Sequence, residues 1–338
     1  MRRSRPGVAI VGAGLMGQWH AAAARQAGAR VLAIVDPDAV AGQRLASRFG
    51  AVVLPSIERL IETAVQPTVA HVCTPAASHV DLVHQLFERR LHVVCEKPLA
   101  PDAGSVTRLY TLAAQAARQL CPVHQFTTQR GFTQALARLP EIGELRRIAF
   151  VFHSAGGTGH PVEMHDALVA EILPHPLSLL ARLQPKHALA DVAWELRSPM
   201  PGEWLAIGVQ GSATVSISIS LSARPTQASA VIAGSTGTID VDFFHGFGTL
   251  GRGRPSRADK MLRPFVASLT QFGAASLNAA RRAVAKETAY PGLRGLLERF
   301  YAAIDEPGGA KPFDDAEVID IYRARDHLAA AAASAGRG

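Results

Sequence analysis

The chain has 338 residues, of which 48% are hydrophobic and 19% charged, as in globular proteins large enough for two domains. No apolar stretch approaches the roughly 18 to 20 uncharged residues that a membrane span requires, so we expect no membrane span. The formal charge of +7 would suit nucleic acid, but no recognition motif or aromatic platform accompanies it, so we expect no nucleic-acid partner.

The start of the chain and its cysteines indicate the compartment. Residues 1–6 are basic, but the apolar run 8–11 ends at glycines instead of continuing as a signal-peptide core. Cys73, Cys95 and Cys121 are odd in number and show no C-x-x-C spacing. Each lies in or beside an apolar run, so we expect three reduced, buried thiols in a cytoplasmic protein.

The first predicted elements form a nucleotide-binding turn. Residues 7–11 are typical of a buried parallel strand, and a helix is predicted over 18–26. Between them lies Gly12-Ala13-Gly14-Leu15-Met16-Gly17, with the G-x-G-x-x-G spacing. In such a turn the first glycine permits the tight bend, the second lets a pyrophosphate approach and the third lets helix and strand pack. The helix N-terminus offers free N–H groups to phosphates.

Asp36 ends the next predicted strand, 31–36, about twenty residues after the turn. A carboxylate there accepts hydrogen bonds from the adenosine ribose. It also repels a 2′-phosphate, which favours NAD over NADP, although Arg44 leaves NADP as an alternative. The other interpretation is that Asp36 only caps the turn with Pro37.

Strands and helices then alternate, which predicts a doubly wound parallel sheet with ligands at the carboxyl ends of its strands. Thr74, Lys97 and His124 lie at such ends. Pro98 restricts the backbone of Lys97 and so aims its side chain, although a salt bridge to Glu96 would be a purely structural role. Strands are predicted at 51–54, 69–73, 91–95 and 120–124, and helices at 38–48, 57–64, 79–90 and 102–118.

After about residue 126 the pattern changes to strands separated by turn signals. We predict antiparallel strands at 145–153, 192–197, 204–210, 213–222, 228–233 and 238–243. One face of this sheet would pack on helices and the other would meet solvent or a second subunit. We therefore predict a dinucleotide-binding Rossmann domain over 1–122 and a substrate-binding and oligomerisation domain over 123–338.

A basic helical segment, at about 251–290, is the least explained part of the chain. Its apolar residues, from Met261 to Phe272, recur at helical spacing. We interpret it as an amphipathic surface helix or an oligomer contact, with a membrane or acidic-partner site as the alternative. Between 251 and 286, Asp259 stands alone against Arg252, Arg254, Arg257, Lys260, Arg263, Arg281, Arg282 and Lys286.

Titratable residues gather between the first two strands of the second half. Glu171 and His175 are four apart and would share one helix face. Pro174 and Pro176 remove backbone donors, so the helix should kink or restart there. His165 and His175 could bind a metal with Glu163 or Glu171, but no zinc-type spacing is present and we expect no metal.

The turn at 12–17, Asp36, Thr74-Pro75 with His79, and Cys95-Glu96-Lys97-Pro98 together resemble the Gfo/Idh/MocA oxidoreductases. The resemblance implies an N-terminal Rossmann domain, a C-terminal α/β domain with an open, mostly antiparallel sheet, and a homodimer or homotetramer. It implies NAD, or alternatively NADP, held by Gly12, Ala13, Gly14, Leu15, Met16, Gly17, Asp36, Thr74, Pro75, His79, Glu96 and Lys97.

The resemblance also implies an Asp-x-x-x-His pattern near the nicotinamide, opposite Lys97. His175 matches the histidine, and Glu171 stands in place of the aspartate. Leu173 replaces a small residue, and Ser178 replaces an acidic one. We take this as a hypothesis that the substrate carries fewer hydroxyls than a free sugar or inositol.

The expected reaction moves a hydride between nicotinamide and a carbinol, carbonyl or imine carbon of a small molecule. Lys97 and His175 would form the acid–base pair, since an unperturbed histidine has a pKa of about 6.5. Glu171 would orient His175 or bind a substrate hydroxyl. Further pocket candidates are His124, Gln125, His153, Glu163 and His165.

Three alternatives remain open from the residues. The protein could be a redox-neutral epimerase, lyase or glycosidase that uses NAD transiently. It could be a non-catalytic, nucleotide-binding regulatory protein. His175 itself could be a structural histidine.

Overall fold

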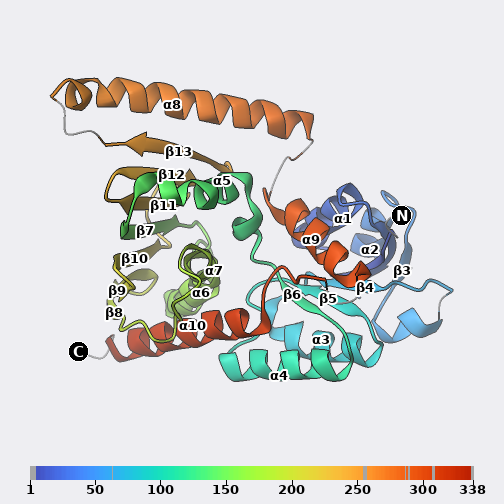
Figure 1. The fold of residues 1–338 in the computed structure, drawn as a ribbon. Coiled ribbons are helices and arrows are strands. Elements are labelled where there is room, and N and C mark those ends of the chain that lie inside the picture. The colour runs from blue at the N-terminus through green and yellow to red at the C-terminus, as the bar shows by residue number, and fades with distance from the viewer. Residues whose placement is uncertain are drawn as a thin grey trace. The chain divides into compact units, whose positions relative to one another are not determined.

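The computed structural model describes residues 5–62, 64–253, 257–285, 287, 290–306 and 309–335. The chain divides into two compact units (Figure 1). Unit 1 consists of Met1–His124 with Leu293–Tyr322, and unit 2 of Gln125–Gly292 with Arg323–Gly338. The sequence pattern placed the whole of 123–338 in one domain, whereas the structure returns residues 293–322 to unit 1.

Unit 1 is built on a six-stranded sheet in the order β3-β2-β1-β4-β5-β6, with every pairing parallel. Its core strands are apolar runs buried on both faces, as expected for a parallel sheet covered by helices. The sheet confirms the predicted Rossmann architecture. The strands are β1 (Gly7–Val11), β2 (Arg30–Val35), β3 (Val52–Leu54), β4 (Val69–Val72), β5 (His92–Cys95) and β6 (Leu120–Pro122).

Two helices of unit 1 begin at aspartates whose side chains cap them. Asp38 accepts hydrogen bonds from Val40 and Ala41, and Asp102 accepts one from Ser105. The predicted helix at 57–64 is a 3-10 segment, Glu58–Glu62, within the described residues. The main helices are α1 (Leu15–Gln26), α2 (Ala39–Ala46), α3 (His79–Glu88), α4 (Ala103–Gln115) and α9 (Leu293–Asp305).

Helix α9 explains why unit 1 takes a segment from the end of the chain. Its apolar stripe, which includes Leu296, Leu297 and Phe300, is fully buried. An amphipathic helix is stabilised mainly by burying such a stripe, and α9 does so against α1 of the same unit. Helix α10 (Asp315–Ala335) then passes from unit 1 into unit 2.

Unit 2 is built on a seven-stranded sheet in the order β13-β12-β11-β7-β10-β9-β8. Its pairings are antiparallel except for β10 on β7, which is parallel, so the sheet is mixed. The strands are β7 (Leu145–His153), β8 (Glu195–Met200), β9 (Glu203–Gln210), β10 (Ala213–Ser220), β11 (Gln227–Gly234), β12 (Gly237–Asp242) and β13 (Phe247–Arg252).

The sheet of unit 2 has one buried face. Along β9 burial alternates strictly, with Trp204 and Ala206 inside and Leu205, Ile207 and Val209 exposed. The predicted strand at 192–197 begins three residues later, and β13 was not predicted because glycines at 248 and 251 weaken its strand pattern. The helices are α5 (Arg130–Arg138), α6 (His165–Ile172), α7 (Pro174–Leu183) and α8 (Arg257–Val284).

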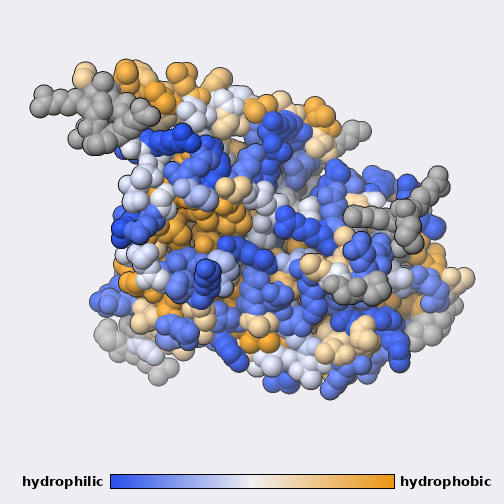
Figure 2. Space-filling view, in the orientation of Figure 1, coloured by the Kyte–Doolittle hydropathy of each residue, from blue (hydrophilic) through white to orange (hydrophobic). Residues whose placement is uncertain are grey.

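The basic segment contains the predicted amphipathic surface helix, α8, which packs along β13. Its apolar side chains are exposed, including Met261 at 77% and Phe272 at 73%. Figure 2 shows them as orange atoms over α8. Arg254 and Lys286 lie outside the described residues, as do the side chains of Arg257, Asp259 and Lys260.

Two further predictions concern the whole described chain. All three cysteines are free and buried, which confirms that prediction. Among the described helices, none is long and apolar enough to cross a membrane.

Candidate functional site

The glycine turn joins β1 to α1 at the carboxyl edge of the parallel sheet. Gly12 has a φ of +99°, a backbone conformation that favours glycine. A Cβ on Gly17 would lie 1.9 Å from the carbonyl oxygen of Gly12, so only glycine fits there. A Cβ on Gly14 would meet no atom within 4 Å. The turn therefore leaves open space at the residue where a pyrophosphate would approach, beside the free N–H groups of α1.

Asp36 follows β2 and connects two parts of the same edge. Its Oδ2 accepts a hydrogen bond from Ala13 N–H at 2.6 Å, and its Oδ1 accepts one from Asp38 N–H at 2.8 Å. A carboxylate has about four lone-pair sites, so both oxygens can still accept from ribose hydroxyls. Asp36 therefore caps the turn, as the second interpretation of the sequence proposed, and its oxygens can still accept hydrogen bonds from a ribose.

Lys97 follows β5, and its backbone is held by the residue before it. Glu96 is buried, and its Oε2 accepts the Lys97 N–H at 3.1 Å. The Lys97–Pro98 peptide bond is cis. The Lys97 side chain is half-buried, and its Nζ has no hydrogen bond or ion pair to any described residue. The salt bridge to Glu96 that would explain Lys97 structurally is therefore not made, because His20 takes that carboxylate instead.

His79 ties two loops of the carboxyl edge together. Its Nδ1 lies 2.8 Å from the carbonyl oxygen of Pro98, and its Nε2 lies 2.9 Å from that of Thr74. Carbonyl oxygens accept and do not donate, so a ring nitrogen that carries hydrogen is the donor in each contact. The Leu99 N–H donates to the Tyr322 hydroxyl next to this point. The turn that carries Lys97 is thus anchored from both sides, while Thr74 also bonds Ser78 through its hydroxyl at 2.7 Å.

His124 closes the carboxyl edge after β6. It is fully buried and meets the Phe313 ring edge to face at 5.3 Å. Full burial indicates a packing role within unit 1.

In unit 2 one helix ends and the next begins between Glu171 and His175. Helix α6 ends at Ile172, and α7 begins at Pro174 with prolines at its first and third positions, which confirms the predicted restart. Glu171 lies in α6 and His175 in α7, and Leu173 between the two helices has a helical backbone conformation. The Glu171 carboxylate has no hydrogen bond or ion pair to any described residue, so it does not orient His175 here.

The His175 ring is enclosed by aromatic side chains of unit 2. The Phe126 ring lies 4.6 Å away, and the Phe152 ring is parallel to it at 6.4 Å. Phe243 stacks on both phenylalanines. Ser178, which stands where an acid was expected, is buried and donates to the His175 carbonyl oxygen at 2.9 Å. Phenylalanine rings therefore lie next to the His175 ring.

The remaining pocket candidates of unit 2 differ in burial. Gln125 is buried, His153 and His165 are half-buried, and Glu163 is exposed. Three of their polar atoms are buried without a hydrogen-bond partner among the described residues: Gln125 Oε1, His153 Nδ1 and His165 Nε2. Unpaired buried polar atoms are costly in a finished core, so these three residues remain candidates for binding a polar ligand.

No three histidine, cysteine, aspartate or glutamate side chains in the described part of the chain are grouped so that they could hold a metal ion. His165 and His175 lie at the starts of different helices.

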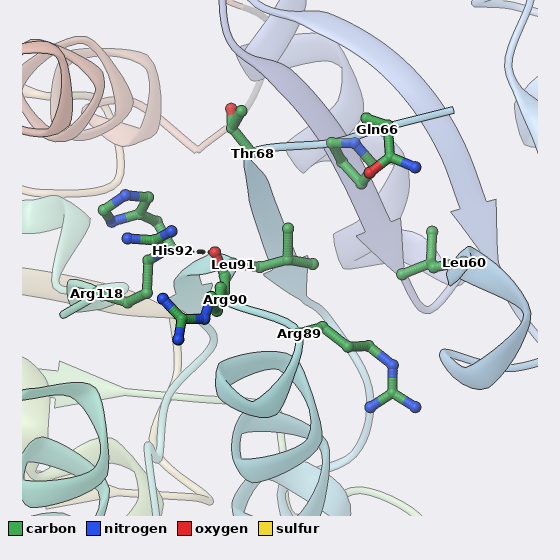
Figure 3. A pocket seen from close by; sticks show the side chains of 9 residues that line it. Leu60, Gln66, Thr68, Arg89, Arg90, Leu91, His92 and Arg118 are labelled. Carbon is green, nitrogen blue, oxygen red and sulfur yellow. Dashed lines mark hydrogen bonds between the residues drawn. The ribbon is translucent and has the colours of Figure 1, made fainter. Parts of the chain in front are cut away.

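A cavity of about 430 Å³ lies at the opposite, amino edge of the unit 1 sheet (Figure 3). Arg89, Arg90 and Arg118 line it, and Arg118 donates to the Arg90 carbonyl oxygen. These arginines follow the C-termini of α3 and α4, where cations offset the negative end of the helix dipole. The same dipoles repel an anion, so we do not assign the nucleotide to this cavity.

Sequence reasoning missed two residues near Lys97. His20 and His71 are both fully buried, and His20 contacts Glu96. The available signal was a histidine inside the otherwise apolar strand β4.

Comparison with known proteins agrees with the geometry of unit 1. Residues 7–124 match the family model GFO_IDH_MocA, described as an oxidoreductase family with an NAD-binding Rossmann fold. The chain is 36% identical over 163 residues to inositol 2-dehydrogenase 4 of Saccharopolyspora erythraea, covering 47% of this chain and 44% of that protein. It is 31% identical over 144 residues to inositol 2-dehydrogenase 1 of Paenarthrobacter aurescens, covering 41% and 42%. The matches thus span less than half the length of these relatives.

Solved structures share the fold over the whole chain. Levoglucosan dehydrogenase in complex with NADH and levoglucosan superimposes with a TM-score of 0.76 at 15% identity, covering 98% of each chain. An inositol dehydrogenase homologue from Azotobacter vinelandii, complexed with NADH and myo-inositol, gives 0.72 at 17% identity, covering 98% of this chain and 97% of that one. At such identities the likeness establishes the fold.

Proposed function

Because residues 7–124 match the model of the Gfo/Idh/MocA oxidoreductases, we propose that the chain is an NAD-dependent dehydrogenase or reductase of this family acting on a small molecule. The observation that carries this proposal is the carboxyl edge of the unit 1 sheet. There an open glycine turn, a ribose-binding carboxylate and an unpaired lysine follow three different strands. Ligands of open α/β sheets bind at this edge.

NAD, when bound, accepts or supplies the hydride. The residues fit it: the space beside Gly14 admits the pyrophosphate, and Asp36 accepts the ribose hydroxyls. Since Asp36 carries a negative charge toward that ribose, NAD is preferred over NADP. The exposed Arg44 is the residue through which NADP could still bind.

Lys97 and His175 act on the substrate oxygen in this proposal. The Lys97 ammonium, which forms no ion pair with a described acid although its charge acts on Glu96, polarises a carbonyl oxygen or stabilises a developing alkoxide. His175 accepts or returns the proton of the hydroxyl group. Glu171, whose carboxylate is unpaired, binds a substrate hydroxyl in preference to orienting His175. Gln125, His153, Glu163 and His165 are proposed to bind the rest of the substrate, and His124 remains a candidate from the sequence.

The substrate is proposed to carry fewer hydroxyls than a free sugar or inositol. Phe126 and Phe152 flank His175, and Ser178 replaces an acid that could have bound hydroxyls. Leu173, which stands in place of a small residue, supports the proposal less than its sequence position suggested, because it is buried in the core.

A screen of purified protein with NAD and a panel of secondary alcohols tests the proposal, with NADH formation followed at 340 nm. The panel pairs myo-inositol with singly and doubly deoxygenated cyclitols, and a pyranose with its deoxy derivatives. We expect kcat/KM to rise as hydroxyls are removed. A preference for the fully hydroxylated member of every pair contradicts the substrate proposal but leaves the dehydrogenase proposal intact. Product without net NADH indicates a redox-neutral reaction, and absence of any reaction favours a non-catalytic protein.

A cytoplasmic homodimer or homotetramer is also proposed. Three reduced, buried thiols suit a reducing compartment. The outer face of the unit 2 sheet exposes Leu205, Ile207, Val209 and Val231, which a second subunit could cover. Light scattering of the wild type and of Ile207→Asp measures this, and an unchanged monomeric mass in both contradicts the proposal.

A further inference from the structure

Three polar side chains that the sequence analysis did not single out lie in line with Glu96 inside unit 1. They are His20 on α1, His71 in β4 and Tyr301 on α9. His20 and His71 are 0% exposed, Tyr301 is 4% exposed and Glu96 is 7% exposed. Such a line is costly to bury unless every member has a partner.

Each member bonds the next over a hydrogen-bond distance. The Tyr301 hydroxyl lies 3.0 Å from His71 Nε2, and His71 Nδ1 lies 3.1 Å from His20 Nδ1. His20 Nε2 lies 3.0 Å from Glu96 Oε1. The other carboxylate oxygen, Oε2, accepts the backbone N–H of Lys97 at 3.1 Å. The line therefore runs without a break from α9 to the backbone of the proposed catalytic lysine.

Glu96 is an anion in this line. Burial raises its pKa, but the hydrogen bond and charge of His20, the charge of Lys97 and the Lys97 backbone bond outweigh burial and lower it. The other titratable groups near Glu96 are Cys73 and Cys95, and burial followed by the Glu96 charge raises the pKa of both thiols well above their ordinary value. Both thiols are therefore neutral, and the charges that face Glu96 come from His20 and Lys97.

The charge of Glu96 determines which side chains donate and which accept in these hydrogen bonds. Because a carboxylate only accepts, His20 must donate from Nε2. Burial, and then the charge of His20, lower the pKa of His71 well below its ordinary value, so His71 is neutral. When His20 carries hydrogen on Nε2 alone, it accepts at Nδ1 from His71, and His71 accepts at Nε2 from the Tyr301 hydroxyl. When His20 carries hydrogen on both ring nitrogens, Nε2 still donates to Glu96, while the other two bonds reverse and the Tyr301 hydroxyl accepts.

Both patterns satisfy every hydrogen bond, and both keep Glu96 ionised in one orientation. We propose that His20, His71 and Tyr301 are positioning residues that hold the Glu96 carboxylate against the Lys97 backbone, so that the lysine keeps one geometry and a fixed negative charge beside it. This inference rests on the proposed function of Lys97 in hydride transfer. It assigns a positioning role to Tyr301 on α9, which reaches Glu96 only through His71 and His20.

Tyr301→Phe tests the line by removing one oxygen atom. It leaves His71 Nε2 without a partner, which weakens the fixing of Glu96, and we expect kcat to fall about tenfold, the scale of leaving one buried group unsatisfied. The KM for NAD should change less than about twofold, because the glycine turn and Asp36 are untouched. The acid limb of the kcat/KM profile should move to higher pH, since the pKa of Glu96 is no longer lowered as far.

Tyr110→Phe is the matched control. Tyr110 lies on α4 of the same unit, is 5% exposed, and its hydroxyl has no hydrogen-bond partner among the described residues. We expect its kcat, KM and pH profile to equal those of the wild type. Equal behaviour of the two tyrosine variants overturns the proposal.

A second pair of variants separates positioning from general packing. His20→Gln retains an amide N–H that can donate to Glu96, whereas His20→Leu cannot donate. We expect the glutamine variant to keep at least about threefold more activity than the leucine variant at similar thermal stability. Equal activity of the two overturns the proposal.

Nitrogen NMR of the histidine rings gives a readout without turnover. We expect the His71 ring signals to shift in Tyr301→Phe and not in Tyr110→Phe. A wild type that turns over no substrate contradicts the proposed function, and unshifted His71 signals contradict the line itself, so the two failures are distinguishable.

Discussion

The carboxyl edge of unit 1 and the α6–α7 junction of unit 2 carry the two halves of the proposed chemistry, and they are built differently. Around Lys97, Glu96, His79 and Tyr322 all bond the backbone of the turn. Around His175, aromatic rings lie against the side chain and Ser178 bonds the backbone carbonyl oxygen, while the Glu171 carboxylate bonds no described residue. Hydrogen bonds to the backbone fix one geometry, whereas ring packing tolerates changes of side chain. We therefore expect the first region to determine the cofactor chemistry and the second to determine the substrate.

Lys97→Met should give the largest effect on activity. It removes the only charge proposed to act on the substrate oxygen, and kcat should fall about 10²- to 10⁴-fold. Affinity for NADH, measured by fluorescence titration, should stay within about threefold of the wild type. Lys186→Ala, an exposed lysine of unit 2, serves as the control.

His175→Asn examines the second region in the same assay. If unit 2 mainly determines the substrate, His175→Asn should change the order of preference among substrates as well as kcat. A loss as large and as uniform as that of Lys97→Met would contradict the division of roles.

Gly17→Ala tests the packing of the glycine turn, and Gly14→Ala tests its binding of NAD. A Cβ added at Gly17 would overlap the Gly12 carbonyl oxygen, so we expect a loss of about 3 kcal/mol in the free energy of unfolding. A Cβ added at Gly14 enters open space, so stability should change by less than about 0.5 kcal/mol while NAD binding weakens at least about tenfold. Urea denaturation and NADH titration measure both quantities. Intact NAD binding in Gly14→Ala would place the pyrophosphate elsewhere.

Asp36→Asn tests the choice of cofactor. Removing the charge should raise the KM for NAD about tenfold and lower the KM for NADP, since the repulsion of the 2′-phosphate disappears. Asp38→Asn, which changes the cap of α2 instead, should leave the NAD-to-NADP ratio unchanged. The same ratio in both variants would assign Asp36 a purely structural role.

His92→Gln should give the smallest effect, confined to stability. Burial, followed by the charge of Arg118, lowers the pKa of His92 to about 4. Between pH 6.5 and 4 the unfolded chain takes up a proton that the folded chain does not, so wild-type stability falls as the pH falls through this window. We expect a smaller decrease in Tm over this window in His92→Gln than in the wild type. His84→Gln, an exposed histidine of α3, should leave the decrease unchanged.

The sequence pattern was most reliable where one physical signal decided the structure. Buried parallel strands are short apolar runs, and β1, β2, β4 and β5 were predicted within about two residues of their ends. The sequence pattern was less reliable for short segments and for strands that contain glycine. The stretch 57–64 gave a 3-10 segment, and β13 was missed because its glycines lower its strand propensity.

Local sequence was sufficient to specify the parallel sheet, the glycine turn, Asp36 and the lysine after β5, because spacing along the chain dictates which residues follow a strand. The helix restart between Glu171 and His175 was also specified locally, by Pro174 and Pro176. The return of α9 to unit 1 and the alignment of His20, His71 and Tyr301 behind Glu96 became visible only in three dimensions. Those contacts join residues 51, 76 and 230 positions apart, and no local pattern records a distance of that kind.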